Sequence, residues 1–139
     1  MGPNDAQIVR IFSREEKGLI ADFTLKANGN AEIVVEAEAG HTLHGLGGDY
    51  LVTLVIRDLS DGTLIPATVQ TVTTPNKVVG RFRDSNWQHL AATFAFLVPA
   101  TELSGRREHL LQAYGSVVYG NDDESGATLA TSPLFMIQP

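Results

Sequence analysis

Alternation of apolar and polar residues with a period of two runs through most of this 139-residue chain. Successive side chains of a strand point to opposite faces, so this pattern is typical of a sheet with one buried face. Residues 31–39, for example, place Ile33, Val35 and Ala37 on one side and three glutamates on the other. Turn residues separate such segments, and an amphipathic helical stripe of ten residues is absent from the sequence. The sequence therefore predicts an all-β protein.

The number and spacing of these segments narrow the fold class. About eight or nine strands can be placed along the chain, at the spacing expected of a sandwich or barrel. We predict an antiparallel β-sandwich of the immunoglobulin or fibronectin-III type, with a small β-barrel as the alternative. The length suits one domain covering residues 1–139, and no linker or repeat divides the sequence. Residues 1–6 are expected to form a flexible N-terminal segment.

Three turn signals predict how neighbouring strands connect. Asn28-Gly29 favours a hairpin between residues 18–27, with Leu19 and Phe23 facing inward, and residues 31–39. Asp61-Gly62 predicts a second hairpin after the strand at residues 49–58. Pro66 cannot donate a hydrogen bond to a ladder, so the strand that contains it is expected at an edge or to start late.

The passage at residues 98–120 carries a family resemblance. Leu103 is followed by Gly105, and then by the pattern Leu111-x-Ala113-x-Gly115-x-Val117. This stretch resembles the connection between strands E and F of an immunoglobulin-like or fibronectin-III-like sandwich. The chain departs from that pattern because its tyrosine, Tyr114, does not come early in the strand, and because the Cys…Trp…Cys set of antibody domains is missing. The resemblance implies architecture only.

Composition excludes several classes of function. A net charge of −6 argues against nucleic-acid binding, which needs a basic face. With no cysteine, the chain has no disulfide, thiolate metal site or cysteine nucleophile. No apolar run approaches the roughly 20 residues that span a bilayer, and the first residues lack a signal-peptide pattern. We expect no cofactor, and the compartment is left open.

The stretch HTLHGLGGDY, residues 41–50, raises two alternatives that the sequence disfavours. His41 and His44 would share a side only on a helix, and the glycines at 45, 47 and 48 argue against one. A phosphate-binding glycine loop would lead into a helix, whereas this one leads into a strand. We therefore interpret it as a flexible loop that enters a central strand.

One surface is the candidate binding site. Arg81 and Arg83 are followed closely by Trp87, the only tryptophan, and by His89. Arginine and tryptophan are frequent in binding hot spots, and aromatic rings stack on sugars, so a platform could also include Tyr119. The competing interpretation is that Trp87 belongs to the core and that the arginines protect an edge strand.

Acidic residues supply the remaining candidates. Asp122, Asp123 and Glu124 offer oxygen ligands to calcium, although successive carboxylates are usually a solvated loop tip. For catalysis, an acid in an apolar environment is needed to raise its pKa, and Asp58 is expected to point outward. A serine nucleophile elbow is also absent, so we expect no enzyme.

These observations predict a non-catalytic protein-interaction or assembly module that binds another protein or copies of itself. Residues 50–56 are apolar on both faces, and Ala91, Thr93 and Ala95 form a face of small residues that another layer could approach. A carbohydrate-binding module is the alternative, and a hydrolase that uses acidic residues is the third hypothesis.

Overall fold

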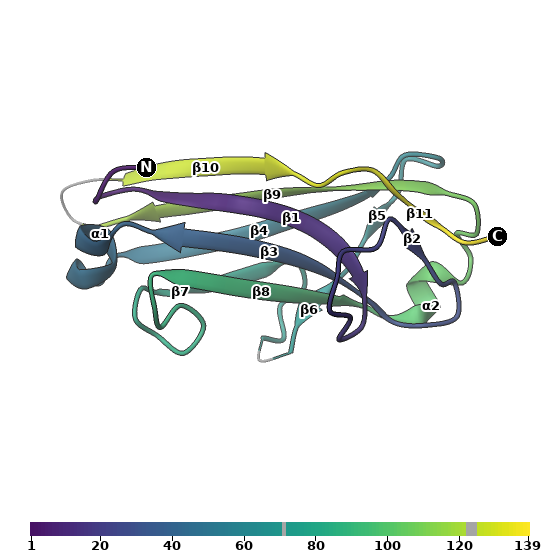
Figure 1. The fold of residues 1–139 in the computed structure, drawn as a ribbon, viewed down its shortest axis with the longest axis horizontal. Coiled ribbons are helices and arrows are strands. Elements are labelled where there is room, and N and C mark those ends of the chain that lie inside the picture. Colours follow the sequence, from purple (N-terminus) through teal and green to yellow (C-terminus); the bar gives the residue numbers. More distant parts are fainter. Residues whose placement is uncertain (71, 122–124) are drawn as a thin grey trace.

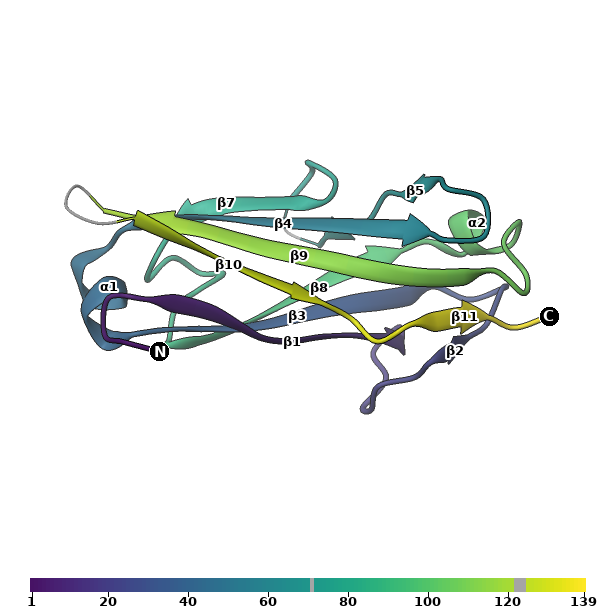
Figure 2. The same ribbon diagram turned by 90° about the horizontal axis from the view of Figure 1, so that it is seen from above.

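Two β-sheets packed face to face form the structure, a computed structural model that describes residues 1–70, 72–121 and 125–139 (Figure 1 and Figure 2). These residues contain eleven strands and two short helices: β1 (Ala6–Glu15), β2 (Thr24–Leu25), β3 (Ala31–Ala39), α1 (His41–Leu46), β4 (Asp49–Asp58), β5 (Leu64–Ile65), β6 (Thr68–Val69), β7 (Lys77–Arg81), β8 (Ala91–Val98), α2 (Ala100–Leu103), β9 (Leu110–Gly120), β10 (Ser125–Thr131) and β11 (Phe135–Ile137). The prediction of an all-β protein is confirmed.

The order of the strands identifies the type of sandwich. Sheet A has the order β1-β3-β8-β6, and sheet B has the order β2-β11-β9-β4-β5. In sheet B, β10 also pairs with β9, and β7 pairs with β4. This order corresponds to the A-B-E-D and G-F-C-C′ sheets of an immunoglobulin fold. The predicted immunoglobulin-like sandwich is confirmed, and the barrel alternative is wrong because the described strands form two open sheets.

The core lies between the sheets, where the alternation places it. Val35 and Phe94 are paired neighbours on β3 and β8 of sheet A, and both are buried. On β4, the side chains at even positions from Tyr50 to Ile56 are also buried, while those at odd positions face away from the core. Hydrophobic side chains from both inner faces therefore make one core, as the period of two predicts.

The first predicted hairpin is wrong. Residues 19–23 do not form a strand, and β3 pairs with β1 rather than with residues 18–27. The loop bends away because Ser13 and Asp22 exchange hydrogen bonds: Asp22 N donates to Ser13 O at 2.7 Å, and Ser13 Oγ donates to Asp22 O at 2.6 Å. β2 then joins the other sheet, where it runs parallel to β11. A local turn signal was outweighed by these longer-range bonds.

The second hairpin and the effect of Pro66 follow the predictions. β4 and β5 pair across the turn at Asp61-Gly62, in which Gly62 has a φ of +78°. Pro66 divides the following segment into two strands of two residues each, β5 in sheet B and β6 in sheet A. Because proline lacks an N–H, the chain leaves one ladder at this residue and enters the other.

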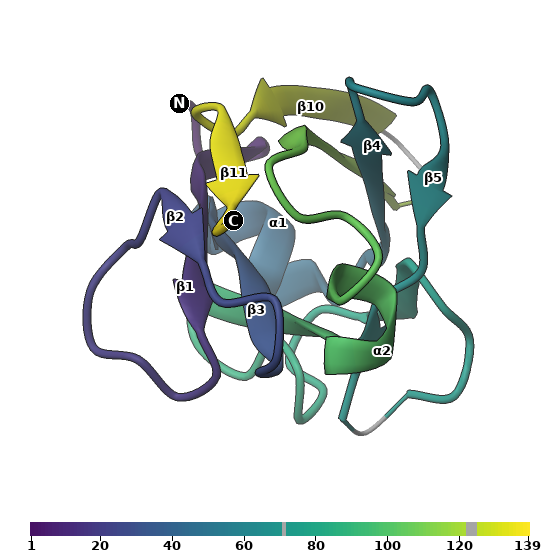
Figure 3. The same cartoon turned by 90° about the vertical axis from the view of Figure 1, so that its right-hand side faces the viewer.

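The passage from β8 to β9 crosses from sheet A to sheet B, as the resemblance to an E–F connection implies. The helix α2 makes this crossing at the end of the sandwich (Figure 3). Leu103 of α2 is buried and closes this end of the core. The helices α1 and α2 have six and four residues, and neither helix is long enough to cross a membrane.

The first residues of the chain contact α1. Pro3 O accepts hydrogen bonds from Thr42 N at 3.0 Å and from Leu43 N at 2.9 Å, and Asp5 O accepts one from Gly40 N at 2.7 Å. These bonds satisfy backbone groups at the start of the helix, which otherwise lack partners. The division into one domain with a flexible segment at residues 1–6 stays a prediction.

Candidate functional site

Trp87, the centre of the predicted binding site, lies in the hydrophobic core. Its side chain is 0% exposed, and its rings lie 4.8 Å from Phe82 and 5.0 Å from Tyr50, measured between centroids. The indole Nε1 donates to Leu90 O at 3.1 Å, so its polar atom is also satisfied inside the protein. A ring with no exposed face cannot stack on a sugar, which corrects the role suggested for Trp87.

The same core includes Tyr119 and Tyr50, which pair across β9 and β4. Tyr119 is 9% exposed, so it adds almost no accessible surface to a platform. Burial and the neighbouring Asp84 carboxylate raise the pKa of Tyr50, whose hydroxyl donates to Asp84 Oδ1 at 2.8 Å. Both predicted aromatic contributors to a sugar platform therefore serve packing instead.

The other predicted site residues, Arg81, Arg83 and His89, are exposed. Arg81 closes the end of β7, where its Nη2 donates to Gly47 O at 3.0 Å and its Nε lies 3.5 Å from Asp49 Oδ1. These three side chains therefore lie on the surface, whereas Trp87 and Tyr119, the aromatic residues expected beside them, are buried. Binding by these residues stays a prediction.

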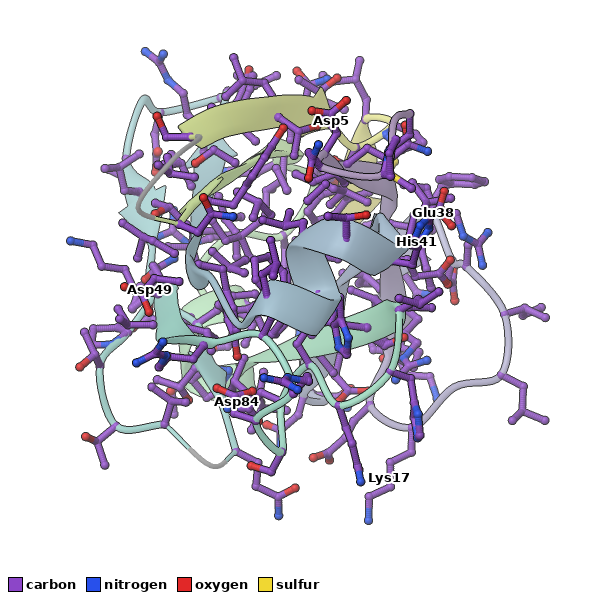
Figure 4. The ribbon with its side chains drawn as sticks, turned by 90° about the vertical axis from the view of Figure 1, so that its left-hand side faces the viewer. Asp5, Lys17, Glu38, His41, Asp49 and Asp84 are labelled. Carbon is purple, nitrogen blue, oxygen red and sulfur yellow. The ribbon has the colours of Figure 1, made fainter. Side chains whose placement is uncertain are left out.

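The two histidines of residues 41–50 lie on a helix, contrary to expectation. α1 is a single helix that ends at Gly47, whose φ of +72° suits glycine. The imidazoles nevertheless do not meet: His44 is buried with its Nε2 2.9 Å from Trp87 O, whereas His41 is exposed beside Glu38 (Figure 4). The interpretation of this stretch as a flexible loop is therefore wrong for residues 41–46, which form a helix, although Gly47 and Gly48 do lead into β4.

A charged cluster that the sequence did not predict joins β4 to the loop before β9. Asp58 is 0% exposed, and its Oδ2 accepts hydrogen bonds from Arg106 Nη1 at 2.8 Å and from His109 Nδ1 at 2.7 Å. The prediction that Asp58 points outward is wrong. Its position, two residues beyond inward-facing Ile56, was the available signal.

The electrostatics of this cluster favour a structural role. Burial by itself raises the pKa of Asp58, but hydrogen bonds from His109, Arg106 and the amides of Ser60 and Asp61 outweigh burial and lower it. A carboxyl held ionised is unsuited to act as a general acid at neutral pH.

Oxygen and nitrogen atoms of Asp58, Asp61 and His109 lie within 4.8 Å of one another, a spacing that could suit a metal ion. The Arg106 guanidinium already supplies the positive charge there, however, at 2.8 Å from Asp58. We interpret the cluster as an ion-pair network. The calcium candidates Asp122, Asp123 and Glu124 lie outside the described residues, so that hypothesis stays a prediction.

The outer face of sheet B carries exposed apolar side chains on neighbouring strands. Register places Ala127, Val118, Leu51 and Val79 side by side in one row across β10, β9, β4 and β7. Val79 is 73% exposed and Val118 is 50% exposed. This apolar row, with no helix or strand of the described chain over it, makes the outer face of sheet B the candidate functional site.

More apolar side chains extend the row toward the β4–β5 hairpin. Val55 pairs with Tyr114 on β9, Leu129 on β10 pairs with Ser116, and Leu64 occupies β5; the four apolar side chains are all exposed. Charged side chains of the described outer face stand at its margins, at Asp49 and Arg81 on one end and at Arg57 on the other, with Lys77 at the β7 edge. An apolar centre with a charged rim is the usual anatomy of a protein interface.

Comparison with known proteins gives structural matches only. No protein-family model and no curated protein matches the sequence. The structure is similar to AggA, the major subunit of aggregative adherence fimbriae type I from Escherichia coli, with a TM-score of 0.55 and 10% identity over 97% of both chains. Weaker similarities are to a DUF4466 family protein from Parabacteroides merdae (TM-score 0.45, 14% identity, 94% of this chain and 45% of that one) and to the CooA pilin subunit from enterotoxigenic Escherichia coli (TM-score 0.38, 10% identity, 94% and 99%). The AggA match agrees with the immunoglobulin-like sandwich.

Proposed function

We propose that this chain is a non-catalytic structural subunit that associates with copies of itself through the outer face of sheet B. The apolar row Ala127–Val118–Leu51–Val79 carries the proposal. Water-exposed apolar area of this kind is costly to hydrate, and a second protein surface would remove it from water. The similarity to AggA, a fimbrial major subunit of matching length, supports a component of an assembly.

The shape of the face also suits packing against another surface. The row contains alanine, valine and leucine, which are short enough to let a second layer approach. Sheets pack face to face at about 10 Å when such side chains interdigitate. Association through this face does not require any loop to become ordered, because pairing within sheet B already fixes the strands that present the row. The entropic cost of binding is therefore small.

The mass of the protein in solution tests the proposal. Light scattering coupled to size-exclusion chromatography should give a mass above 15.0 kDa that rises with concentration. Val118→Lys places a charge in the middle of the row and should return the mass to that of the monomer. Thr93→Lys is the matched control, because Thr93 is exposed on the outer face of sheet A.

Each outcome has a distinct meaning. Dissociation by Val118→Lys alone supports assembly through sheet B. Dissociation by Thr93→Lys alone would move the contact to the small-residue face around Ala95, and a wild-type protein that stays monomeric at every concentration would reject self-association.

A further inference from the structure

An exposed apolar loop and an apolar cleft lie on different parts of the same molecule, and we infer that they join one copy to the next, head to tail. The loop carries Leu19 and Ile20 between β1 and β2, and the cleft lies at the β4–β5 edge of sheet B. This inference rests on the proposed self-assembly and names its geometry: the Leu19–Ile20 loop of one copy inserts into the cleft of a second copy.

The loop presents more apolar surface than a soluble protein normally leaves in water. Leu19 is 99% exposed, Ile20 is 79% exposed and the nearby Phe23 is 52% exposed. Single exposed apolar residues are ordinary, but two consecutive aliphatic side chains at the apex of one loop form a compact anchor.

The base of the loop is fixed although its apex is exposed. Lys17 N donates to Glu32 Oε1 at 2.9 Å, and Gly18 N donates to Glu15 O at 2.8 Å. On the other side, Asp22 exchanges two hydrogen bonds with Ser13, and its Oδ1 accepts from Thr24 N at 3.0 Å. These bonds fix both ends of the apex. Inserting the apex into a second molecule would therefore cost little additional backbone freedom.

The cleft arises from a gap in the edge of sheet B. β4 pairs with β7 over Asp49–Thr53 and with β5 at Ile56 and Arg57, so neither strand pairs with Leu54 and Val55. Asn76 bridges the gap: its backbone O accepts from Leu54 N at 2.9 Å, and its Nδ2 donates to Leu54 O at 3.0 Å. The backbone groups of Leu54 at the bottom of the cleft are therefore satisfied, and the surface that the cleft offers to a partner is mainly apolar.

The size and lining of the cleft suit aliphatic side chains. Its volume is about 370 Å³, near the lower end for ligand pockets, which fits one or two side chains better than a large ligand. Its walls include Val55, Leu64 and Pro66. A second hollow beside Leu64 is lined by Val55 and Tyr114, so Leu64 stands between two apolar depressions.

The charges beside the two surfaces are opposite. Residues 15–22 contain Glu15, Glu16 and Asp22 against Lys17, a net charge of −2. The cleft and its adjoining hollow are flanked by Lys77 and Arg57, both exposed, and neither forms an ion pair within the described residues. This complementarity favours a second copy of the chain as the occupant, because the same sequence supplies both members of the pair.

The positions of the loop and the cleft on the molecule determine the symmetry of the contact. Figure 3 shows the β1–β2 loop protruding on one side of the sandwich and β5 on the opposite side, so the two cannot meet within one molecule. A contact between two different surfaces is heterologous, and it leaves an unused loop at one end and an unused cleft at the other. Repetition of this contact builds an open chain of subunits.

Two variants that disable opposite ends test the inference. Leu19→Ser/Ile20→Ser removes the two aliphatic side chains of the loop. Leu64→Glu places a negative charge at the cleft, which would repel the net negative charge of residues 15–22 in the incoming copy. Each should weaken self-association by at least about 100-fold, as expected when aliphatic side chains lose their burial. Leu46→Glu is the matched control for the second variant, because Leu46 and Leu64 are both 64% exposed and Leu46 lies on α1.

Mixing the two variants gives the sharpest outcome. Each variant alone should be a monomer of 15.0 kDa, and an equimolar mixture should form a complex of twice that mass and nothing longer, because both remaining ends are disabled. Intact folding of each variant is checked by the blue-shifted fluorescence of buried Trp87.

The alternatives are distinguishable. Two unmixed monomers, or oligomers that persist in both variants but dissociate with Val118→Lys, would overturn the head-to-tail contact and leave the proposed assembly standing. A monomeric wild-type protein would overturn both.

Discussion

The outer faces of the two sheets use the same strand geometry but treat their apolar residues differently. On sheet A, Phe12 and Val34 face outward yet are buried, and Arg10 extends over Phe12 with its Cζ 4.2 Å from the ring centroid. Cross-strand ion pairs hold such long side chains in place, as between Arg14 Nε and Glu32 Oε1 at 3.0 Å. On sheet B, Val79 and Val118 have no such cover.

The difference teaches that an outward apolar residue is not by itself a binding surface. Long charged side chains can cover apolar area with their own methylene groups while their charges remain in water. On sheet A, side chains of the same molecule cover the apolar residue Phe12 in this way. Sheet B carries alanine, valine, leucine and serine at the equivalent central positions, and its cover would have to come from another molecule.

The largest expected effect tests which residues face the core, because this determines which residues lie on the two outer faces. Phe94 is 1% exposed between the sheets, so Phe94→Ala should lower the free energy of unfolding by about 3–5 kcal/mol. Chemical denaturation followed by Trp87 fluorescence measures this loss. A loss below about 1 kcal/mol would mean that the inward and outward phases are exchanged and that the comparison of faces fails.

The next effect concerns charge pairing in the interior. Asp58→Ala removes the buried carboxylate that Arg106 and His109 share and leaves Arg106 only the more exposed Asp61 and Glu102 as ion-pair partners. It should lower the free energy of unfolding by about 3 kcal/mol, as measured by urea denaturation at neutral pH.

The pH dependence of Asp58 gives a second readout. Its folded-state pKa lies below the ordinary 3.8, so the stability it contributes is present above pH 3.8 and is lost as the pH falls below that value. Asp58→Asn should therefore flatten the acid limb of the unfolding free energy. An unchanged acid limb would show that other carboxyls govern it.

A smaller effect is expected on the covered face. Glu32 accepts hydrogen bonds from Arg14 Nε and from Lys17 N, so Glu32→Ala should lower the free energy of unfolding by about 1 kcal/mol. The difference from wild type should shrink in high salt, because salt screens partly exposed pairs. If the loss is the same at every salt concentration, packing rather than charge accounts for the cover on sheet A.

The smallest effect on stability is expected on the uncovered face. Val118→Lys should change the free energy of unfolding of the monomer by no more than about 0.5 kcal/mol, since the side chain is half exposed. Urea denaturation at low protein concentration measures this. A large loss would mean that Val118 stabilises the monomer itself, and the contrast between the two faces would then be weaker than we describe.

The sequence predicted the central strands well because their signal is local. Alternation at residues 31–39 and 91–98 directly reports burial on one face, and the two-sided apolar run at 50–56 correctly marked a strand with an unusual outer face. Strand order adds the information that the apolar residues of β4 line up with those of β7, β9 and β10. That alignment depends on register between distant segments, which single-strand periodicity does not contain.

The failures share a cause. Leu19 and Phe23 fit an inward strand phase but lie on an exposed loop, because Ser13 and Asp22 divert the chain and β1 takes the place beside β3. The prediction that Asp58 faces outward misjudges the phase of its strand, because Asp58 lies two residues beyond inward-facing Ile56. Its partners, Arg106 and His109, lie about fifty residues away in sequence, where no local pattern could identify them.

The pairing of β2 with β11 has a consequence for how the fold forms. It joins Thr24 to Met136 and Leu25 to Ile137, so this edge of sheet B cannot be completed until residues 136 and 137 have left the ribosome. Contacts between residues so far apart close slowly. Until they close, the nascent domain exposes the edge of β9 that β11 will cover and the side chain of Leu25, so this is the interval in which it most needs protection from aggregation.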